Sequence, residues 1–460
     1  MRTFSIHTLG CKVNQYESRQ IREFLTQLGL SDQTSRAPAE LVVINTCCVT
    51  QAASAKSRQQ IRRAQKQNPD SAIVVCGCLP MAQTGELHEP CENIHLIRHR
   101  ESIAAALSQI VNGKTTSSDL QGPQTRQNCI KTKNNPKIKY KNKLTNPPKL
   151  PLLTSFEGQT RAFLKIQDGC DGYCSYCIIP KTRPHVQNKP ADAVLQEAQQ
   201  LVRAGHKEIV LTGIFLGAYG QGTVRRKNWV NQTNNELAKL LDKMAQIPNL
   251  ARIRLSSLEP ADITPKLLDT FCRHRNIMPH LHLSLQSGSD KILSRMCRQY
   301  TAEESRETIE LIKSRLDRPA ITADFIVGYP GETDGDFQQT VELAQESGFA
   351  KMHVFSFSPR SGTVAAGLQA TVNTKVIKAR SKILRNLDTE LAGRFRQLFI
   401  GTTDTVLIEN NKNGWISGRS ERYFTVYFDK NNGNLKRNDL VKVKLIQNRE
   451  DGVFGQCPLA

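Results

Sequence analysis

The chain has 460 residues and a formal net charge of +21, with 63 Lys and Arg against 42 Asp and Glu. This length allows about two to four domains, and no apolar run of about eighteen residues is present, so we expect no membrane span. The N-terminal stretch lacks a long apolar core, which predicts a cytosolic protein, and the large positive charge favours a polyanionic partner, nucleic acid above all.

Residues 1 to 112 alternate apolar strand patterns with helical patterns. The predicted strands are 3–9, 41–45 and 72–76, and the predicted helices lie around 21–28 and over 54–67. Alternation of this kind is typical of parallel strands that are covered by helices. This segment is therefore predicted to form a small Rossmann-like, doubly wound α/β domain.

One cysteine follows each of these predicted strands: Cys11, Cys47 and Cys78. The carboxyl ends of parallel strands share one edge of a sheet, where ligands bind, so we expect the three thiols to converge. Gly10 and Gly77 would let the backbone approach a bulky group closely. The alternative is a set of buried structural thiols, since free cysteine is often buried.

The segment 113–158 has a different composition. Residues 112–155 carry nine Lys or Arg and one acidic residue, Asp119, among many Asn, Pro, Thr and Gln. Few apolar residues are available to form a core, so we predict a flexible basic linker. Contact with RNA phosphate and a plain solvated spacer are equally good interpretations of this linker.

Residues 159–397 again alternate strands and helices. The predicted strands are 162–166, 208–212, 252–256, 280–285, 322–327 and 351–357. Repeated strand–helix units of this kind predict an open or partial (βα)6 barrel with its chemistry at the carboxyl ends of the strands. A basic amphipathic helix is predicted over 374–397, and its cations are interpreted as a solvated face.

Three cysteines after the first of these strands, Cys170, Cys174 and Cys177, lie in the run GCDGYCSYCIIP. The spacing C-x3-C-x2-C gives three thiolates and no fourth, unlike the four-cysteine runs of ferredoxins and the paired C-x2-C of zinc ribbons. Three ligands on a cubane cluster leave one iron open to a small molecule. A zinc site or structural thiol cluster is the alternative. Gly169 and the aromatic Tyr176 fit a tight loop with a ring beside the ligand.

From 398 to 460 the sequence shows five short strand patterns split by Gly and Asn, which predict a small β-barrel. Such barrels often bind RNA. This segment has nine basic and seven acidic residues, so its composition alone supports RNA binding only weakly.

The C-x3-C-x2-C loop resembles that of the radical S-adenosylmethionine (SAM) enzymes. Two three-cysteine sets, on a Rossmann-like domain and then on a βα-barrel that precedes a small terminal barrel, resemble the methylthiotransferases over nearly the whole chain. The runs TLGCKVNQYES, LTGIFLGAYG, RLSSLEP, LQSGSDKIL, DFIVGYPGET and HVFSFSPRSGT are most similar to the MtaB branch. That branch acts on N6-threonylcarbamoyladenosine beside the tRNA anticodon.

The resemblance implies four parts: a methylthiotransferase domain (1–112), the linker, a radical SAM core (159–397) and a TRAM-type RNA-binding barrel (398–460). It also implies two [4Fe-4S] clusters, one on each three-cysteine set, and SAM as a cosubstrate. The implied partners are tRNA and an electron donor such as flavodoxin or ferredoxin with its reductase. The residues that it places around SAM are Tyr176, Ser257, Glu259, Gln286, Ser287, Gly328 and Gly331.

The implied reaction is methylthiolation at C2 of N6-threonylcarbamoyladenosine 37, in which a 5′-deoxyadenosyl radical removes the C2 hydrogen. The sequence departs from the family pattern at Cys48, Cys76, Ser284 and Cys297, and the first two could compete as ligands of the N-terminal set. Alternative substrates are isopentenyladenosine tRNA and a ribosomal-protein aspartate. The alternative of another class is a non-catalytic RNA-binding iron–sulfur sensor.

Overall fold

The computed structural model describes residues 1–33, 38–82, 93–113, 148–229, 233–412, 415–429 and 435–457. The chain divides into two compact units, Met1–Leu153 and Thr154–Ala460. Most of the predicted linker lies outside the described residues. Its described end belongs to the first unit, because Leu150 packs against that unit's core and the Gln20 amide donates to the Pro151 carbonyl at 2.7 Å.

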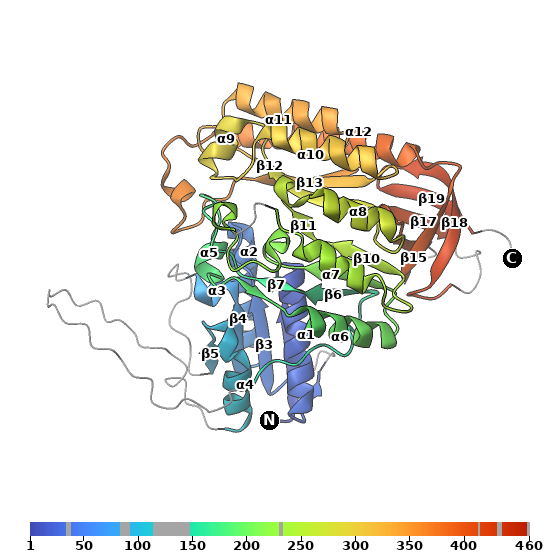
Figure 1. The fold of residues 1–460 in the computed structure, drawn as a ribbon. Helices are drawn as coiled ribbons and strands as arrows, with labels where there is room; N and C mark the ends of the chain where they lie inside the picture. Colours follow the sequence, from blue (N-terminus) through green and yellow to red (C-terminus); the bar gives the residue numbers. More distant parts are fainter. Residues whose placement is uncertain are drawn as a thin grey trace. The chain divides into compact units, whose positions relative to one another are not determined.

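The first unit is a parallel five-stranded sheet in the order β2-β1-β3-β4-β5 with helices packed on it (Figure 1). Its strands are β1 (Thr3–Thr8), β2 (Ser31–Asp32), β3 (Leu41–Thr46), β4 (Ala72–Gly77) and β5 (Ile94–Leu96). Its helices are α1 (Lys12–Gln27), α2 (Gln51–Gln67), α3 (Cys78–Met81) and α4 (Ile103–Val111). The predicted doubly wound domain is confirmed.

Apolar periodicity explains this packing. Every residue of β3 is buried, as a central strand covered on both faces requires. In α1, Ile21 and Leu25 lie one turn apart and pack with Phe4 of β1 in the core. Thr50 caps the start of helix α2: its hydroxyl accepts the Ala53 N–H at 3.1 Å and satisfies one of the free amides of the first turn.

The second unit contains a curved parallel sheet in two hydrogen-bonded parts, β10-β9-β6 and β11-β12-β13-β14. Its strands are β6 (Arg161–Lys165), β9 (Glu208–Thr212), β10 (Arg252–Leu255), β11 (Ser257–Leu258), β12 (His280–Gln286), β13 (Ala320–Val327) and β14 (Lys351–Ser356). β10 and β11 are successive parts of one extended segment that changes partner, from β9 to β12. The two parts therefore form one partial barrel, as predicted.

Helices cover the outer face of this partial barrel (Figure 1). They are α6 (Ala191–Arg203), α7 (Glu236–Met244), α8 (Pro265–Arg273), α9 (Asp290–Arg295), α10 (Ala302–Arg315), α11 (Asp334–Ser347) and α12 (Thr374–Gln397). Helices α10 and α11 each begin with a capping box, at Thr301 and Thr333. Helix α12 has the bounds predicted from its amphipathic pattern, and it contacts β14 of the core sheet and one strand of the terminal barrel.

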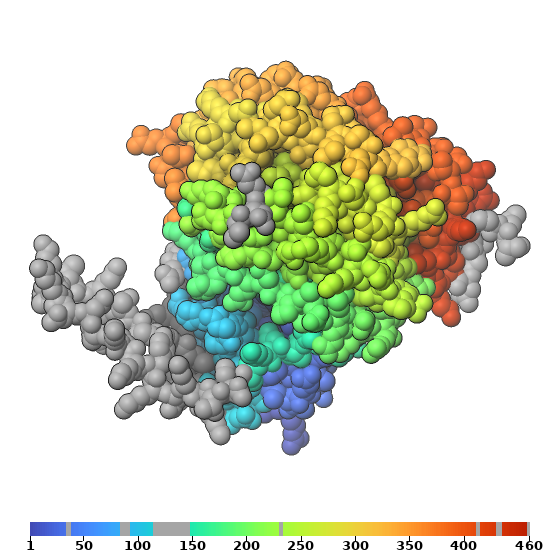
Figure 2. All heavy atoms as spheres, viewed as in Figure 1, coloured from blue at the N-terminus to red at the C-terminus, as the bar shows by residue number. Residues whose placement is uncertain are grey.

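The C-terminal part is a closed barrel in the order β15-β16-β17-β19-β18. Its strands are β15 (Thr403–Lys412), β16 (Trp415–Arg419), β17 (Thr425–Asp429), β18 (Leu440–Arg449) and β19 (Gly452–Gln456). Val406, Ile416 and Phe428 are almost fully buried inside it. Figure 2 shows its red atoms packed directly against the core of the same unit, and the predicted small barrel is confirmed.

A buried charge cluster joins this small barrel to the amino ends of the core strands. Glu208 of β9 lies 2.8 Å from Arg254 and 3.5 Å from Arg252, both on β10, and all three side chains are at most 2% exposed. Arg254 also donates to the carbonyls of Ser420 and Glu421 at 2.7 and 2.8 Å. The small barrel is thus fixed to the end of the core barrel opposite the expected site of chemistry.

No helix in the described part of the chain combines the length and the apolar character needed to cross a membrane.

Candidate functional site

The loop after β6 is held in a tight conformation around its first cysteine. Gly169 has a φ of 75°, and a Cβ there would lie 1.8 Å from the His185 carbonyl oxygen, so only glycine fits. The Cys170 N–H donates to the Arg183 carbonyl at 2.8 Å, and the Cys177 N–H donates to the Cys174 carbonyl at 3.0 Å. These backbone contacts place all three cysteines in one small region of the loop.

These three thiols share a partly exposed environment, so a bound group could reach them. Burial raises the pKa of Cys170, and the neighbouring Cys177 and Cys174 raise it further, which places the three sulfurs within electrostatic reach of one another. A cluster would replace the thiol protons and relieve this crowding, because thiolates are the ligands of iron–sulfur clusters.

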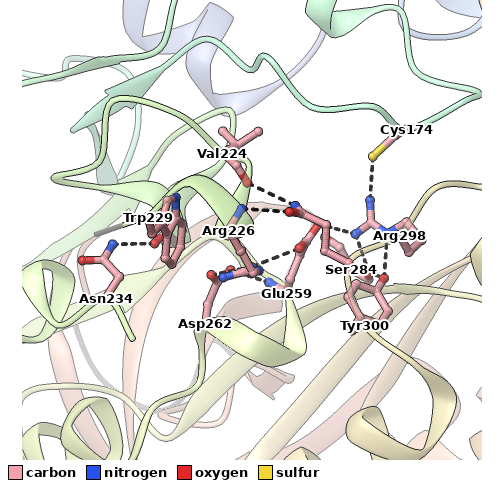
Figure 3. Close-up of polar contacts among 12 residues, drawn as sticks. Cys174, Val224, Arg226, Trp229, Asn234, Glu259, Asp262, Ser284, Arg298 and Tyr300 are labelled. Atoms are coloured by element: carbon pink, nitrogen blue, oxygen red, sulfur yellow. Dashed lines mark hydrogen bonds and ion pairs between the residues drawn. The ribbon is translucent and has the colours of Figure 1, made fainter. Parts of the chain in front are cut away.

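Arg298 connects the cysteine loop to the carboxyl end of the core sheet (Figure 3). Its guanidinium donates to Cys174 Sγ at 3.1 Å and to Glu259 Oε1 at 2.6 Å. The Arg298 Nε–H donates to the Tyr300 hydroxyl at 2.9 Å, and that hydroxyl donates to the Ser284 carbonyl. Since Arg298 is only 6% exposed, it forms a fixed link between a predicted cluster ligand and a predicted SAM contact.

A second arginine holds the other side of Glu259. Arg226 Nη2 lies 3.0 Å from Glu259 Oε2 and 2.8 Å from Asp262 Oδ1 (Figure 3). Glu259 and Asp262 also cap each other's backbone in the turn after β11. Sequence analysis missed both Arg226 and Arg298, because neither lies in a run with a recognisable spacing.

The other predicted SAM contacts differ in accessibility. Gln286 ends β12 with a φ of 67°, unusual for a residue other than glycine. The Ser287 hydroxyl instead accepts the Ser289 N–H at 3.1 Å, which assigns it to the loop structure. Ser257 is exposed, whereas the neighbouring Ser256 is 7% exposed and its hydroxyl has no hydrogen-bond partner among the described residues. Most buried polar groups in folded proteins have a partner, so the Ser256 hydroxyl is able to hydrogen-bond to a polar ligand in this site.

The predicted glycines approach protein side chains. A Cβ at Gly328 would lie 2.4 Å from Ile377, and one at Gly331 would lie 2.4 Å from the Arg295 guanidinium. Both have φ above 80°, so glycine is required for the backbone as well. Tyr176 is partly buried against the cluster of Ile292, Met296, Tyr329 and Ala365, and its hydroxyl accepts from Arg298 at 3.4 Å.

In the first unit the predicted cysteine set does lie at one sheet edge. Cys11 precedes α1, Cys47 follows β3, and Cys78 begins α3 directly after β4. A Cβ at Gly10 would lie 3.0 Å from Cys47 Sγ, so the glycine makes room for that thiol. Cys78 is close enough to Cys11 to interact with it electrostatically.

Two further cysteines near this set have different environments. The Cys48 thiol hydrogen-bonds to Cys78 and lowers the pKa of Cys78 to about 7, and the Arg100 guanidinium, 3.4 Å away, adds to the effect. Cys76 instead packs into the apolar core with Phe4 and Val74. Burial raises the pKa of Cys76 to about 12, and the apolar side chains around it separate its thiol from the predicted set.

One more polar cluster lies on neighbouring strands of the core sheet, at His282, Asp324 and His353. Their potential ligand atoms lie within 4.8 Å of one another, and His282 Nε2 is 3.2 Å from Asp324 Oδ1. The other His282 nitrogen bonds to Thr322 Oγ1 at 2.8 Å, which orients the ring. Two imidazoles and a carboxylate form a donor set that can hold a divalent cation.

Two protein families match this chain. Residues 164–344 match the family described as Radical SAM superfamily. Residues 3–98 match the family described as Uncharacterized protein family UPF0004. The first match covers the cysteine loop with Arg298 and Glu259, and the second covers Cys11, Cys47 and Cys78.

Curated relatives match over nearly the full length. The Threonylcarbamoyladenosine tRNA methylthiotransferase MtaB of Chlamydia pneumoniae is 34% identical over 99% of this chain and 98% of its own. The tRNA-2-methylthio-N(6)-dimethylallyladenosine synthase of Neorickettsia sennetsu is 33% identical over 94% and 88%. Both are named for methylthio modification of tRNA, but for different adenosines.

Among solved structures, the radical S-adenosylmethionine methyltransferase TsrM from Kitasatospora setae has a similar fold, with a TM-score of 0.56. It is 14% identical, and the match covers 80% of this chain and 77% of that one. This likeness concerns the fold alone.

Proposed function

Because this chain belongs to the radical SAM tRNA methylthiotransferase family, we propose that it transfers a methylthio group to C2 of N6-threonylcarbamoyladenosine 37 in tRNA, giving 2-methylthio-N6-threonylcarbamoyladenosine. The observation that carries the proposal is the pair of three-thiol sets, each at the carboxyl ends of parallel strands. The substrate assignment rests on the motifs of the MtaB branch and on full-length relatives with that name.

The family implies SAM and a [4Fe-4S] cluster, and the thiols of the core loop fit such a cluster. We assign it to Cys170, Cys174 and Cys177. We assign a second [4Fe-4S] cluster to Cys11, Cys47 and Cys78, with Cys48 as a hydrogen-bonding neighbour of Cys78. Because Cys76 packs into the apolar core, it is left out of the second set.

The residues around the core loop have distinct roles in this proposal. When bound, the cluster and SAM supply the 5′-deoxyadenosyl radical that removes the hydrogen from C2, where no acidic proton is available to a protein base. Arg298 fixes Cys174 relative to Glu259. Glu259, Gln286 and the unpaired Ser256 hydroxyl offer polar groups to SAM. Such positioning lowers the entropic cost of bringing the reacting atoms together.

The partners follow from the same chemistry. tRNA carries one negative charge per nucleotide, and the chain's net charge of +21 supports phosphate contacts that position it. The target base must leave its stack to reach the core barrel. An electron donor such as flavodoxin or ferredoxin is required, and the tRNA substrate places the reaction in the cytoplasm.

A second candidate is methylthiolation of N6-isopentenyladenosine (dimethylallyladenosine) in tRNA, since relatives with that name also match over nearly the full chain. The two can be separated with reconstituted protein, SAM, a reductant and two tRNAs that carry one or the other unthiolated base. We expect methylthio product from the threonylcarbamoyl substrate. Product from the isopentenyl substrate alone would assign the chain to the other branch.

Variants test the two thiol sets separately. Cys170→Ala should abolish 5′-deoxyadenosine formation, and Cys78→Ala should abolish methylthio product. If Cys170→Ala still forms methylthio product, the catalytic assignment of the core loop is wrong. A wild-type yield of product from Cys78→Ala would reject the second set.

A further inference from the structure

An exposed aromatic ring lies inside the cysteine loop of the core. Tyr173, between Cys170 and Cys174, is 54% exposed, whereas most aromatic side chains of this unit are buried. The Arg225 guanidinium carbon lies 4.0 Å from the ring centroid, and the Lys227 ammonium lies 5.7 Å from it. A ring flanked by two cations at the surface combines the groups that recognise single-stranded nucleic acid, namely a stacking face and phosphate-pairing charges.

The segment that carries the two cations is fixed to the cysteine loop. Asp171 Oδ2 accepts the Thr223 hydroxyl at 2.7 Å, and Asp171 Oδ1 accepts the Val224 N–H at 2.9 Å. The Arg225 Nε–H donates to the Asp171 carbonyl at 2.8 Å. Asp171 of the cysteine loop therefore holds the segment that carries Arg225 and Lys227.

The same segment is also fixed from beneath. Val224 is fully buried and packs with Trp229 and Ala218 against Cys170. Gln299 donates to the Val224 carbonyl at 3.1 Å and accepts the Arg226 N–H at 2.9 Å. Gln299 directly follows Arg298, so the segment and the arginine that binds Cys174 are neighbours (Figure 3). An ordered surface segment with this many contacts is preorganised for binding.

The three consecutive cations of this segment divide between two roles. Arg226 points inward and pairs with Glu259 and Asp262 (Figure 3). Arg225 lies on the Tyr173 ring and also pairs with Asp171, whose Oδ2 is 3.4 Å from the Arg225 Nε. Lys227 lies near the same ring, and in the described part of the chain it makes no ion pair or hydrogen bond. Its charge is therefore available to a phosphate.

We propose that Tyr173, Arg225 and Lys227 form a stacking platform for a base that flanks the target adenosine. The proposal rests on the proposed function and adds the residues that hold the RNA next to the reacting base. The platform belongs to the loop that binds the reactive group, at the carboxyl ends of the core strands where substrates of such barrels bind. A flanking base that stacks there would hold the target nucleotide out of its own stack.

Binding of full-length tRNA with the unthiolated threonylcarbamoyladenosine tests the platform, using the reconstituted full chain. Tyr173→Leu should weaken binding about tenfold or more, because a base stacked on an aromatic ring contributes about 1–3 kcal/mol. Tyr173→Phe and Tyr173→Trp should restore wild-type affinity, since stacking needs the ring and not the hydroxyl. Bound iron is measured for each variant, so that loss of the cluster is recognised.

Salt dependence separates the roles of ring and charge. Tyr173→Leu should leave the slope of log Kd against log salt unchanged, whereas Lys227→Gln should reduce it by about one phosphate contact. Lys313→Gln is the matched control, because Lys313 lies on α10 and pairs with Glu310. It should change neither the affinity nor the slope.

A fluorescent base placed beside the target gives a local readout. We expect 2-aminopurine at a flanking position to be quenched on wild-type protein and on Tyr173→Phe, but not on Tyr173→Leu. If wild type methylthiolates tRNA while Tyr173→Leu binds and quenches like wild type, the platform is wrong and the proposed function stands. If wild type neither binds nor modifies tRNA, both are overturned.

Discussion

Among single residues of the candidate site, Arg298 links the cysteine loop to Glu259. It is buried, and its guanidinium contacts both a predicted cluster ligand and a carboxylate that a second arginine also holds. Removing one partner of a buried pair leaves the other charge without compensation, which costs about 3–5 kcal/mol. The site therefore depends on Arg298 both for its geometry and for its stability.

We expect Arg298→Leu to lower 5′-deoxyadenosine formation from SAM about 100-fold, because a shift of about 1 Å between reacting groups can have that effect. Arg298→Lys, which keeps the charge but loses the forked geometry, should lie between this variant and wild type. The control is Arg306→Leu, since Arg306 is a more exposed partner of Glu346 and Glu303. A wild-type rate for Arg298→Leu would reject this role.

Cys76 and Cys78 provide a matched pair at the end of β4. Cys76 packs into the apolar core, whereas Cys78 lies beside the other predicted ligands. We expect Cys78→Ala to lose about half of the reconstituted iron, since one of two clusters would be lost. Cys76→Ala should retain all of it and lose about 1 kcal/mol of stability through the cavity. Equal iron loss in both variants would contradict this distinction.

At the scale of elements, the contact between the core strands and the small barrel is built on buried charge. Burial alone would raise the pKa of Glu208, but the guanidiniums of Arg254, Arg161 and Arg252 outweigh it and lower that pKa. Arg161 donates in turn to Glu409 of β15 at 2.7 Å. The amino ends of β6, β9 and β10 therefore hold the terminal barrel through the Arg161–Glu409 pair and through hydrogen bonds from the buried Arg252 and Arg254 to backbone carbonyls.

We expect Glu208→Gln to destabilise the second unit by about 3–5 kcal/mol, because three guanidiniums lose their shared counter-charge. The measurement is a chemical denaturation curve under anaerobic conditions. Glu236→Gln is the control, since Glu236 pairs with Lys239 at the exposed start of α7 and should contribute less than about 1 kcal/mol. Equal effects of both substitutions would show that burial of the charge cluster is unimportant.

Asp404, at the start of β15, should make the stability of the contact between the core strands and the small barrel depend on pH. Burial, together with the nearby Glu421, raises the pKa of Asp404 to about 6. A carboxyl whose pKa is higher in the folded chain favours folding when protonated, so stability should fall as pH rises from about 4 through 6. With about 1.4 kcal/mol per pKa unit, the loss is about 3 kcal/mol at neutral pH.

Asp404→Asn should remove this loss. The variant should melt at a higher temperature than wild type at pH 8, and the difference should shrink towards pH 4.5. An unchanged difference between pH 4.5 and 8 would show that Asp404 does not titrate in this range.

At the scale of the whole molecule, sequence reasoning identified the elements better than the contacts. The runs LVVIN and AIVVC predicted buried strands to within a residue of β3 and β4, since continuous apolar runs are typical of covered parallel strands. The predicted cysteine sets lie where strand-end topology placed them. The links through Arg298 and Arg226 were not predictable, because Arg298 and Cys174 are 124 residues apart and meet only in the folded barrel.

The net charge of +21 is a property of the whole chain. If it positions tRNA through phosphates, the logarithm of the binding constant should fall steeply and linearly with the logarithm of the salt concentration, by about 0.7–0.9 per contact. Fluorescence anisotropy of labelled tRNA from 50 to 300 mM salt provides the measurement. A flat response would remove the role assigned to the basic surface.

The central claim is that this chain methylthiolates N6-threonylcarbamoyladenosine in tRNA, and nucleoside mass spectrometry tests it most directly. tRNA is compared from cells with and without the gene. We expect 2-methylthio-N6-threonylcarbamoyladenosine to disappear on deletion and its unthiolated precursor to accumulate. An unchanged nucleoside profile would contradict it.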